Sequence, residues 1–178
     1  MKKYLACLAL LLSTAAAQAQ MPPNYVGRVG GVTKEVCVSP TVTASSAYTA
    51  GNVVGGLITF PSALLAPNSG ILHSVRLTSK SAQTVEFDVS FFSSTPSTTF
   101  TDKTAPSIAA ADVGLVQMVV KLTNSYSGLG THTVYSAEGI SRAINEVGTS
   151  TYAVITTTGT PTFASASDLQ LCATWLQD

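Results

Sequence analysis

Apolar and polar residues alternate along several short segments of the chain, which is the pattern of β-strands that bury one face. The alternation is clearest at 85–91, where Val and Phe occupy the odd positions and Glu, Asp and Ser the even ones. The last predicted strand, 169–176, places two leucines, Ala173 and Trp175 on one face. A continuous apolar run predicts a buried strand at 115–122. Further strands are predicted at 34–38, 52–60, 71–78, 131–135, 139–144 and 152–158.

Clusters of turn-forming residues separate these segments, at the spacing that a β-sandwich or jelly roll requires. They lie at 67–70, 93–97, 124–130 and 159–161. Gly55 and Gly56 lie inside one strand and predict a bulge there. One short helix is expected at 107–113, with Ser107 as its N-cap, and 96–106 is expected to be a long exposed loop. The chain is therefore predicted to be all-β, with a single antiparallel β-sandwich or jelly-roll domain over 34–178.

The first nineteen residues have the three parts of a secretory signal peptide. Two lysines near the start precede an apolar segment at 5–12, and Ala17 and Ala19 form a cleavage site before Gln20. The apolar segment is shorter than the roughly 20 residues of a membrane span. No stable membrane anchor is therefore expected after cleavage, and the protein is predicted to be periplasmic or extracellular.

Two alternatives concern the beginning of the mature chain. Residues 20–33 are rich in Pro and Gly and are predicted to form a flexible N-terminal arm, either a loose leader or a segment that reaches a neighbouring subunit. Translation from Met21 would remove the signal, and a location in a virion would then be expected instead.

Charged residues make up only 10% of the chain, and nine basic residues balance nine acidic ones. Cleavage of the signal would leave seven basic side chains against nine acidic ones, a net charge near −2. No basic patch is visible, so nucleic acid is not an expected partner. A sparsely charged surface rich in Ser and Thr fits both a subunit that packs against its neighbours and an ordinary secreted domain.

Few residues offer catalytic or metal-binding chemistry. Glu86 and Asp88 share a face of one predicted strand at roughly 6.5 to 7 Å, within the range that glycoside hydrolysis uses, but a polar outer face explains them as well. His73 and His132 have no metal-ligand spacing. Three isolated aspartates, Asp102, Asp112 and Asp168, would bind calcium only if folding brought them together. No phosphate-binding or serine-hydrolase motif occurs, so neither enzyme activity, a cofactor nor a metal is predicted.

The cysteines suggest a disulfide. Cys7 leaves with the signal, which leaves Cys37 in the first predicted strand and Cys172 in the last. An even pair in an exported protein favours a bridge within the chain. Both residues are predicted to lie on outward faces, so a bridge between subunits and two free thiols stay open as alternatives.

Several short segments, in their order along 42–178, resemble the small and mostly uncharacterised structural proteins of tailed phages. They are VTASSAYTAGNVVGG at 42–56, SGILHSV at 69–75, FTD at 100–102, IAAAD at 108–112, GTPTFASASDL at 159–169 and LQD at 176–178. The resemblance implies a non-enzymatic virion component, such as a capsid decoration or head-associated protein, and brings no catalytic residues. The secretory signal and the cysteine pair depart from this group.

The expected function is therefore that of a structural protein, either virion-associated or a subunit of an extracellular surface layer or filament. Such a protein is predicted to be a homo-oligomer whose partners are copies of itself or other structural proteins. The alternative is a secreted monomeric binding module for glycans or a cell surface, with loops such as 93–106 and 124–130 forming its site.

Overall fold

The computed structural model describes residues 32–65, 68–123 and 125–177. The predicted signal peptide and its cleavage site before Gln20 lie outside these residues, as does most of the predicted arm. The last two residues assigned to that arm, Val32 and Thr33, belong to the first strand instead. They extend the predicted strand because they continue its pairing with the last strand of the chain.

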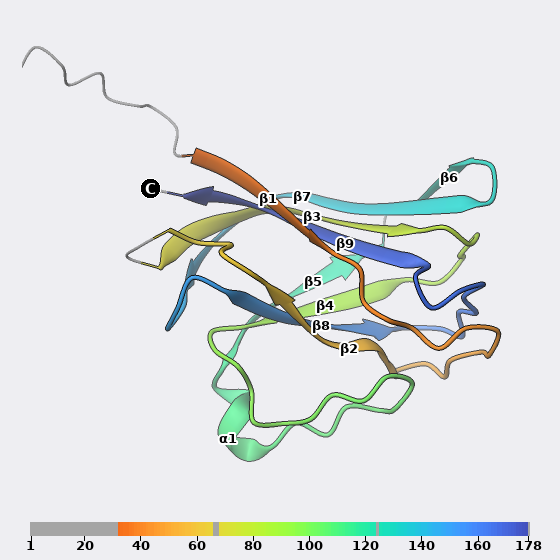
Figure 1. The fold of residues 1–178 in the computed structure, drawn as a ribbon, viewed down its shortest axis with the longest axis horizontal. Coiled ribbons are helices and arrows are strands. Elements are labelled where there is room, and N and C mark those ends of the chain that lie inside the picture. The colour runs from red at the N-terminus through yellow and green to blue at the C-terminus, as the bar shows by residue number, and fades with distance from the viewer. Residues whose placement is uncertain (1–31, 66–67, 124, 178) are drawn as a thin grey trace, which may run out of the picture.

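The described residues form nine strands and one short helix, α1 (Ala110–Val113) (Figure 1). The strands are β1 (Val32–Val38), β2 (Val53–Phe60), β3 (Ser69–Ser79), β4 (Phe87–Phe92), β5 (Val116–Leu122), β6 (Ser125–Leu129), β7 (His132–Asn145), β8 (Thr151–Thr157) and β9 (Leu169–Gln177). All pairings between these strands are antiparallel. The all-β prediction is therefore confirmed.

Two packed sheets give the molecule its sandwich architecture, with strand orders β1-β9-β3-β7-β6 and β2-β8-β4-β5 (Figure 1). β1 pairs with β9, β2 with β8, β3 with β7 and β4 with β5. The chain thus forms one long hairpin whose two arms run together while it rolls into the sandwich, which is the jelly-roll arrangement. β6 is added at the edge beside β7. This nesting places the first strand next to the last.

The core between the sheets uses one face of each strand. In β4, Phe87, Val89 and Phe91 are fully buried, while the residues between them are half-buried. Trp175 of β9 is also fully buried, and its ring packs edge-on against that of Phe60 with centroids 5.2 Å apart. The interior faces predicted for β4 and β9 are confirmed, because alternate side chains of a strand point to opposite faces.

The predicted bulge in β2 lies at Gly55 and Gly56, where the register of pairing with β8 shifts. Both glycines have a positive φ, 78° and 76°, which residues with a Cβ atom rarely adopt. A Cβ on Gly55 would also lie 2.4 Å from the Cβ of Pro40. The bulge therefore requires glycine at position 55 both for its backbone conformation and for its close approach to the neighbouring loop.

The turn predicted at 124–130 is wrong, because Ser125–Leu129 forms the edge strand β6. Tyr126 pairs with Val134 of β7. The Ser- and Gly-rich composition of this segment is typical of a turn, but the unpaired edge of β7 offers backbone partners that favour an extended conformation.

The two strands predicted at 131–135 and 139–144 are one continuous strand, β7. Gly139 and Ser141, inside the second predicted segment, have positive φ angles, and the register with β3 shifts at this point. The chain forms a bulge at this point, which bends a strand without ending it.

The continuous apolar run at 115–122 does not form a fully buried strand. β5 is an edge strand that pairs only with β4 among the described strands. Val120 and Leu122 face the core, whereas the side chain of Val119 is 51% exposed. Leu115 and Val116 pack instead against the outer face of the four-stranded sheet.

That outer face is covered by the chain itself. Phe100 of the connection between β4 and β5 packs there with Val53, Phe92 and Val154, so the segment predicted as an exposed loop forms a second small core. α1 follows this loop and begins after Ala109, with no side-chain cap, so Ser107 is not its N-cap. Within the described ranges, no helix has the length and apolar character that crossing a membrane requires.

Candidate functional site

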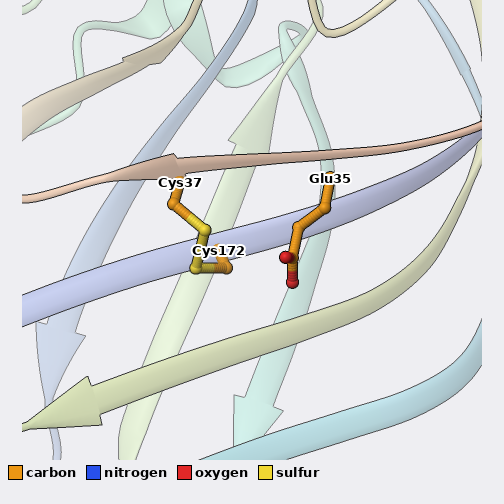
Figure 2. Close-up of side chains that lie close together, drawn as sticks. All are labelled: Glu35, Cys37 and Cys172. Carbon is orange, nitrogen blue, oxygen red and sulfur yellow. A yellow bond between two sulfur atoms is a disulfide. The ribbon is translucent and has the colours of Figure 1, made fainter.

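Cys37 of β1 faces Cys172 of β9, and their sulfur atoms form a disulfide with an S–S distance of 2.04 Å (Figure 2). The bridge predicted within the chain is present, and it leaves neither sulfur for a link between subunits. It lies on the outer face of the five-stranded sheet, as the strand pattern predicted. Cys172 is nevertheless 1% exposed, because β9 has β1 on one side and β3 on the other.

Glu35 lies beside the disulfide on the same face (Figure 2). Its carboxylate and the two sulfur atoms all lie within 4.8 Å of one another. Metal ions bind cysteine as the thiolate, so the bridged sulfurs are not available as ligands. The carboxylate instead pairs with Arg76 of β3 at 3.1 Å, with both side chains about half exposed. This ion pair contributes about 1 kcal/mol or less to stability.

The disulfide and the ion pair lie on the β1 side of a broad surface that we call the open face. The register of the strands aligns its side chains in three rows across the sheet: Glu35, Thr174, Ser74 and Glu138; Cys37, Cys172, Arg76 and Ser136; Gln170, Thr78, Val134 and Tyr126. All of them except Cys172 are exposed or half-buried. No described segment of the chain covers this face, in contrast to the outer face of the other sheet.

The histidines do not form a common site. His73 is the extra residue where the pairing of β3 with β9 shifts register, and its side chain is exposed. His132 begins β7, and its Nδ1 atom lies 2.8 Å from the carbonyl oxygen of Lys80. His73 thus lies within β3 and His132 at the start of β7, and both are ordinary surface residues.

The two carboxylates of the predicted pair, Glu86 and Asp88, have different surroundings. Glu86 is exposed and precedes β4. Asp88 lies within β4 and forms an ion pair with Lys121 of β5 at 3.4 Å. Asp88 is therefore engaged by a cation on the neighbouring strand, which fits a polar outer face.

Asp102 accepts hydrogen bonds from three segments that are distant in sequence. The donors are the backbone N–H of Gly55 at 2.6 Å, the hydroxyl of Tyr48 at 2.8 Å, and both the backbone N–H and the hydroxyl of Thr43 at 2.9 and 2.7 Å. Burial alone would raise the pKa of this carboxyl, but the donors outweigh burial and lower the pKa. The phenol of Tyr48 responds in the opposite direction, because burial and the adjacent carboxylate raise its pKa to about 12.

The other two isolated aspartates stabilise loops of their own. Asp112 of α1 accepts hydrogen bonds from the hydroxyls and backbone N–H groups of Thr98 and Ser97, and these lower its pKa to about 2, the Thr98 hydroxyl having the largest effect. Asp168 accepts a hydrogen bond from the Ser81 hydroxyl at 2.5 Å. The three aspartates each belong to a separate cluster and do not converge on a shared cation site.

Sequence reasoning did not single out Glu146, which lines a surface pocket of the protein. The pocket has a volume of about 340 Å³ and lies at one end of the sandwich. It is lined by Ser94 and Thr95 after β4, Glu146, Val147 and Gly148 after β7, and Tyr152 of β8. Nothing in the local sequence marks Glu146, because its burial results from contact between segments about 50 residues apart.

The carboxyl group of Glu146 has no hydrogen-bond partner within the described part of the chain. Both of its oxygens are buried, and no described residue donates a hydrogen bond to either. Burial raises its pKa to about 8, because removal from water disfavours the charged form. A buried titratable group in a pocket is a typical mark of a functional site, and Glu146 is the only acidic group in the described residues with this combination.

Comparison with known proteins adds no identity. No model of a known protein family matches the chain, and no curated protein matches it.

Proposed function

We propose that the protein is a non-enzymatic structural subunit that assembles with copies of itself through the open face. The observation that carries the proposal is the contrast between the two sheets. The chain covers the outer face of the four-stranded sheet with its own apolar side chains, while the larger sheet exposes a regular, sparsely charged face. Jelly rolls occur both in capsid and in lectin domains, so the fold alone does not choose between assembly and binding.

A second copy is the occupant that the charges of the open face favour. Glu35 and Arg76 form an ion pair across the β1 side of this face. In a two-fold contact the same patch meets itself, so Glu35 of each copy would approach Arg76 of the other. Five strands about 4.8 Å apart and about 25 Å long present roughly 500 Å² per copy, which is less than the 800 Å² or so of a standard interface. Each contact would then be weak, and assembly would rely on many of them.

Assembly is testable by sedimentation velocity over a wide range of protein concentrations. We expect the average mass of the wild type to rise with concentration. Thr78→Lys places a charged side chain in the contact from each copy, where it would have to be desolvated without a partner, and is expected to keep the protein monomeric. Thr160→Lys makes the same change at an exposed loop position outside the open face and serves as the matched control. A wild type that stays monomeric at all concentrations contradicts the proposal.

The compartment and the virion association are part of the same proposal. A disulfide between the first and last strands supports an oxidising location, and therefore export. Mass spectrometry of native material tests this: a chain beginning at Gln20 and two hydrogens lighter than its reduced form is expected. A chain beginning at Met21 with free thiols would instead favour assembly in the cytoplasm, as for a phage head component.

A secreted monomeric binding module is the second candidate, and the Glu146 pocket favours it. Ser94 and Thr95 in its lining belong to the loop segment 93–106 that the sequence suggested for ligand binding. The two candidates differ in oligomeric state. A strictly monomeric protein that binds a glycan or a cell surface through this pocket would support the second and contradict the first.

A further inference from the structure

The pocket at Glu146 has the chemistry of a binding site that is independent of the open face. Its two walls come from different parts of the chain, the segment after β4 and the connection between β7 and β8. Its volume of about 340 Å³ lies at the low end of the range for small-molecule sites. It therefore suits a small ligand or a single side chain.

Several hydrogen-bond acceptors near the pocket have no donor among the described residues. The amide nitrogen of Gln117 donates to the backbone carbonyl of Asn145 at 2.8 Å, which places Gln117 beside the residue that precedes Glu146. The Gln117 side-chain oxygen and both Glu146 oxygens are buried without a donor among the described residues. Of these groups, the two Glu146 oxygens belong to a residue that lines the pocket, and burying such groups unpaired is costly.

A ligand with only donors matches this arrangement best. Ammonium groups carry three donors and guanidinium groups five, and neither accepts. An anion would bring no donors to the Glu146 oxygens, while calcium requires six to eight oxygen ligands, of which the lining side chains supply a single carboxylate and three hydroxyls. The ion pairs found in the described residues, Arg76–Glu35 and Lys121–Asp88, leave Glu146 without a cation.

We propose that the Glu146 pocket binds a primary ammonium or guanidinium group, either that of a small amine or that of a basic side chain. Binding then converts the buried carboxyl to its charged form, because the cation stabilises the carboxylate. Glu146 is protonated at neutral pH in the empty pocket, since burial raises its pKa to about 8. Each binding event at pH 7 should therefore release close to one proton. Tyr152 is the only other titratable residue of the lining.

Calorimetry of the oxidised full chain with methylguanidinium and with butylammonium tests the proposal. Titrations in two buffers of different ionisation enthalpy count the protons released. We expect binding with release approaching one proton at pH 7, little release at pH 9, and affinity lower by about tenfold or more in Glu146→Gln. Glu138→Gln changes an exposed glutamate of β7 outside the pocket and should bind like the wild type.

Three results would overturn the proposal. One is the absence of binding by either cation to the wild type. Another is binding that releases no protons and is unaffected by Glu146→Gln. The third is binding of a neutral sugar in preference to both cations, which would indicate a saccharide pocket. The wild-type carboxyl pKa, followed by ¹³C NMR with and without ligand, requires no variant and decides the question even if Glu146→Gln fails to fold. The same proposal predicts a pKa that falls when the cation binds.

Sedimentation velocity with and without butylammonium distinguishes the two sources of the cation. If the natural ligand is a free amine, butylammonium should bind without changing the sedimentation coefficient. If the pocket holds a basic side chain of another copy, butylammonium should compete with it and lower the average mass. The pocket lies apart from the open face, so Thr78→Lys should leave cation binding intact even where it abolishes assembly.

Discussion

Acidic residues in this protein have opposite responses to pH because their surroundings differ. Asp102 and Asp112 receive several hydrogen bonds each, and their pKa values are lowered. Glu146 receives none from the described residues, and burial raises its pKa. The aspartates therefore stabilise the folded chain when charged, whereas Glu146 favours it only when neutral.

Asp102→Asn is expected to destabilise the protein by about 1 to 3 kcal/mol. The amide has a single acceptor oxygen and no charge, so it can accept fewer and weaker hydrogen bonds from Thr43, Tyr48 and Gly55 than the carboxylate does. Urea denaturation at pH 7 measures the change. Asp88→Asn is the matched control, because its partner Lys121 is largely exposed and a surface pair contributes little. Equal losses in the two variants would contradict a special role for Asp102.

Glu146 predicts that stability falls as the pH rises from about 4.5 to about 8. Over that interval the unfolded chain has lost the proton, while the folded chain, with its raised pKa, still holds it. Glu146→Gln should remove this pH dependence and make the protein more stable at pH 8 by about 1 to 3 kcal/mol. The expected gain is smaller than the full pKa shift implies, because the pocket opens to solvent, which screens the charge. Urea denaturation at pH 5, 7 and 9 measures it. A variant that follows the wild-type profile would contradict the assignment.

At the scale of elements, the sequence predicts the strands that bury one regular face and misses those defined by their neighbours. Apolar and polar residues alternate in β4 and β9, so their buried residues can be predicted directly from the sequence. β6 has no apolar pattern and exists because β7 leaves an edge to pair with. β7 is predicted as two strands, because a bulge at Gly139 and Ser141 disturbs the regular alternation that one continuous strand would show. The Glu146 pocket could not be predicted at all, since no local pattern reports which segments meet in space.

The bulge in β2 yields a prediction at the same scale. Gly55→Ala is expected to cost about 2 to 4 kcal/mol, because the new methyl group would meet Pro40 and alanine disfavours a positive φ. Gly114→Ala is the control: Gly114 has an ordinary helical φ of −68° and open space around it. Thermal unfolding followed by circular dichroism compares the two. Similar melting temperatures for both variants would contradict the role of Gly55.

At the scale of the whole molecule, the nested pairing of strands explains why one covalent bond spans almost the entire fold. β1 and β9 are the outermost pair of the rolled hairpin, so their cysteines face each other although 135 residues separate them in sequence. The sequence predicts the pair itself from the even number of cysteines. The jelly-roll register explains why they meet, and why the buried Cys172 lies on an outward face.

Replacing both cysteines by alanine is expected to destabilise the protein by about 4 kcal/mol, since the bridge closes a very long loop in the unfolded chain. For a domain of this size the melting temperature should fall by about 10 °C. Differential scanning calorimetry of the variant measures this, and wild type held in reductant should give the same value. A variant as stable as the oxidised wild type would contradict the contribution of the disulfide.

The same bond has a mechanical consequence. A pulling force that enters through β1 and leaves through β9 passes from one strand to the other through the sulfur atoms, so the seven strands between them carry no load. The bridge therefore prevents the segment between the two cysteines from extending. That segment of 135 residues would extend by roughly 450 Å, at about 3.3 Å per residue. Single-molecule stretching should release this length only after reduction. A subunit built in this way would keep its shape under tension that pulls apart an unbridged sandwich.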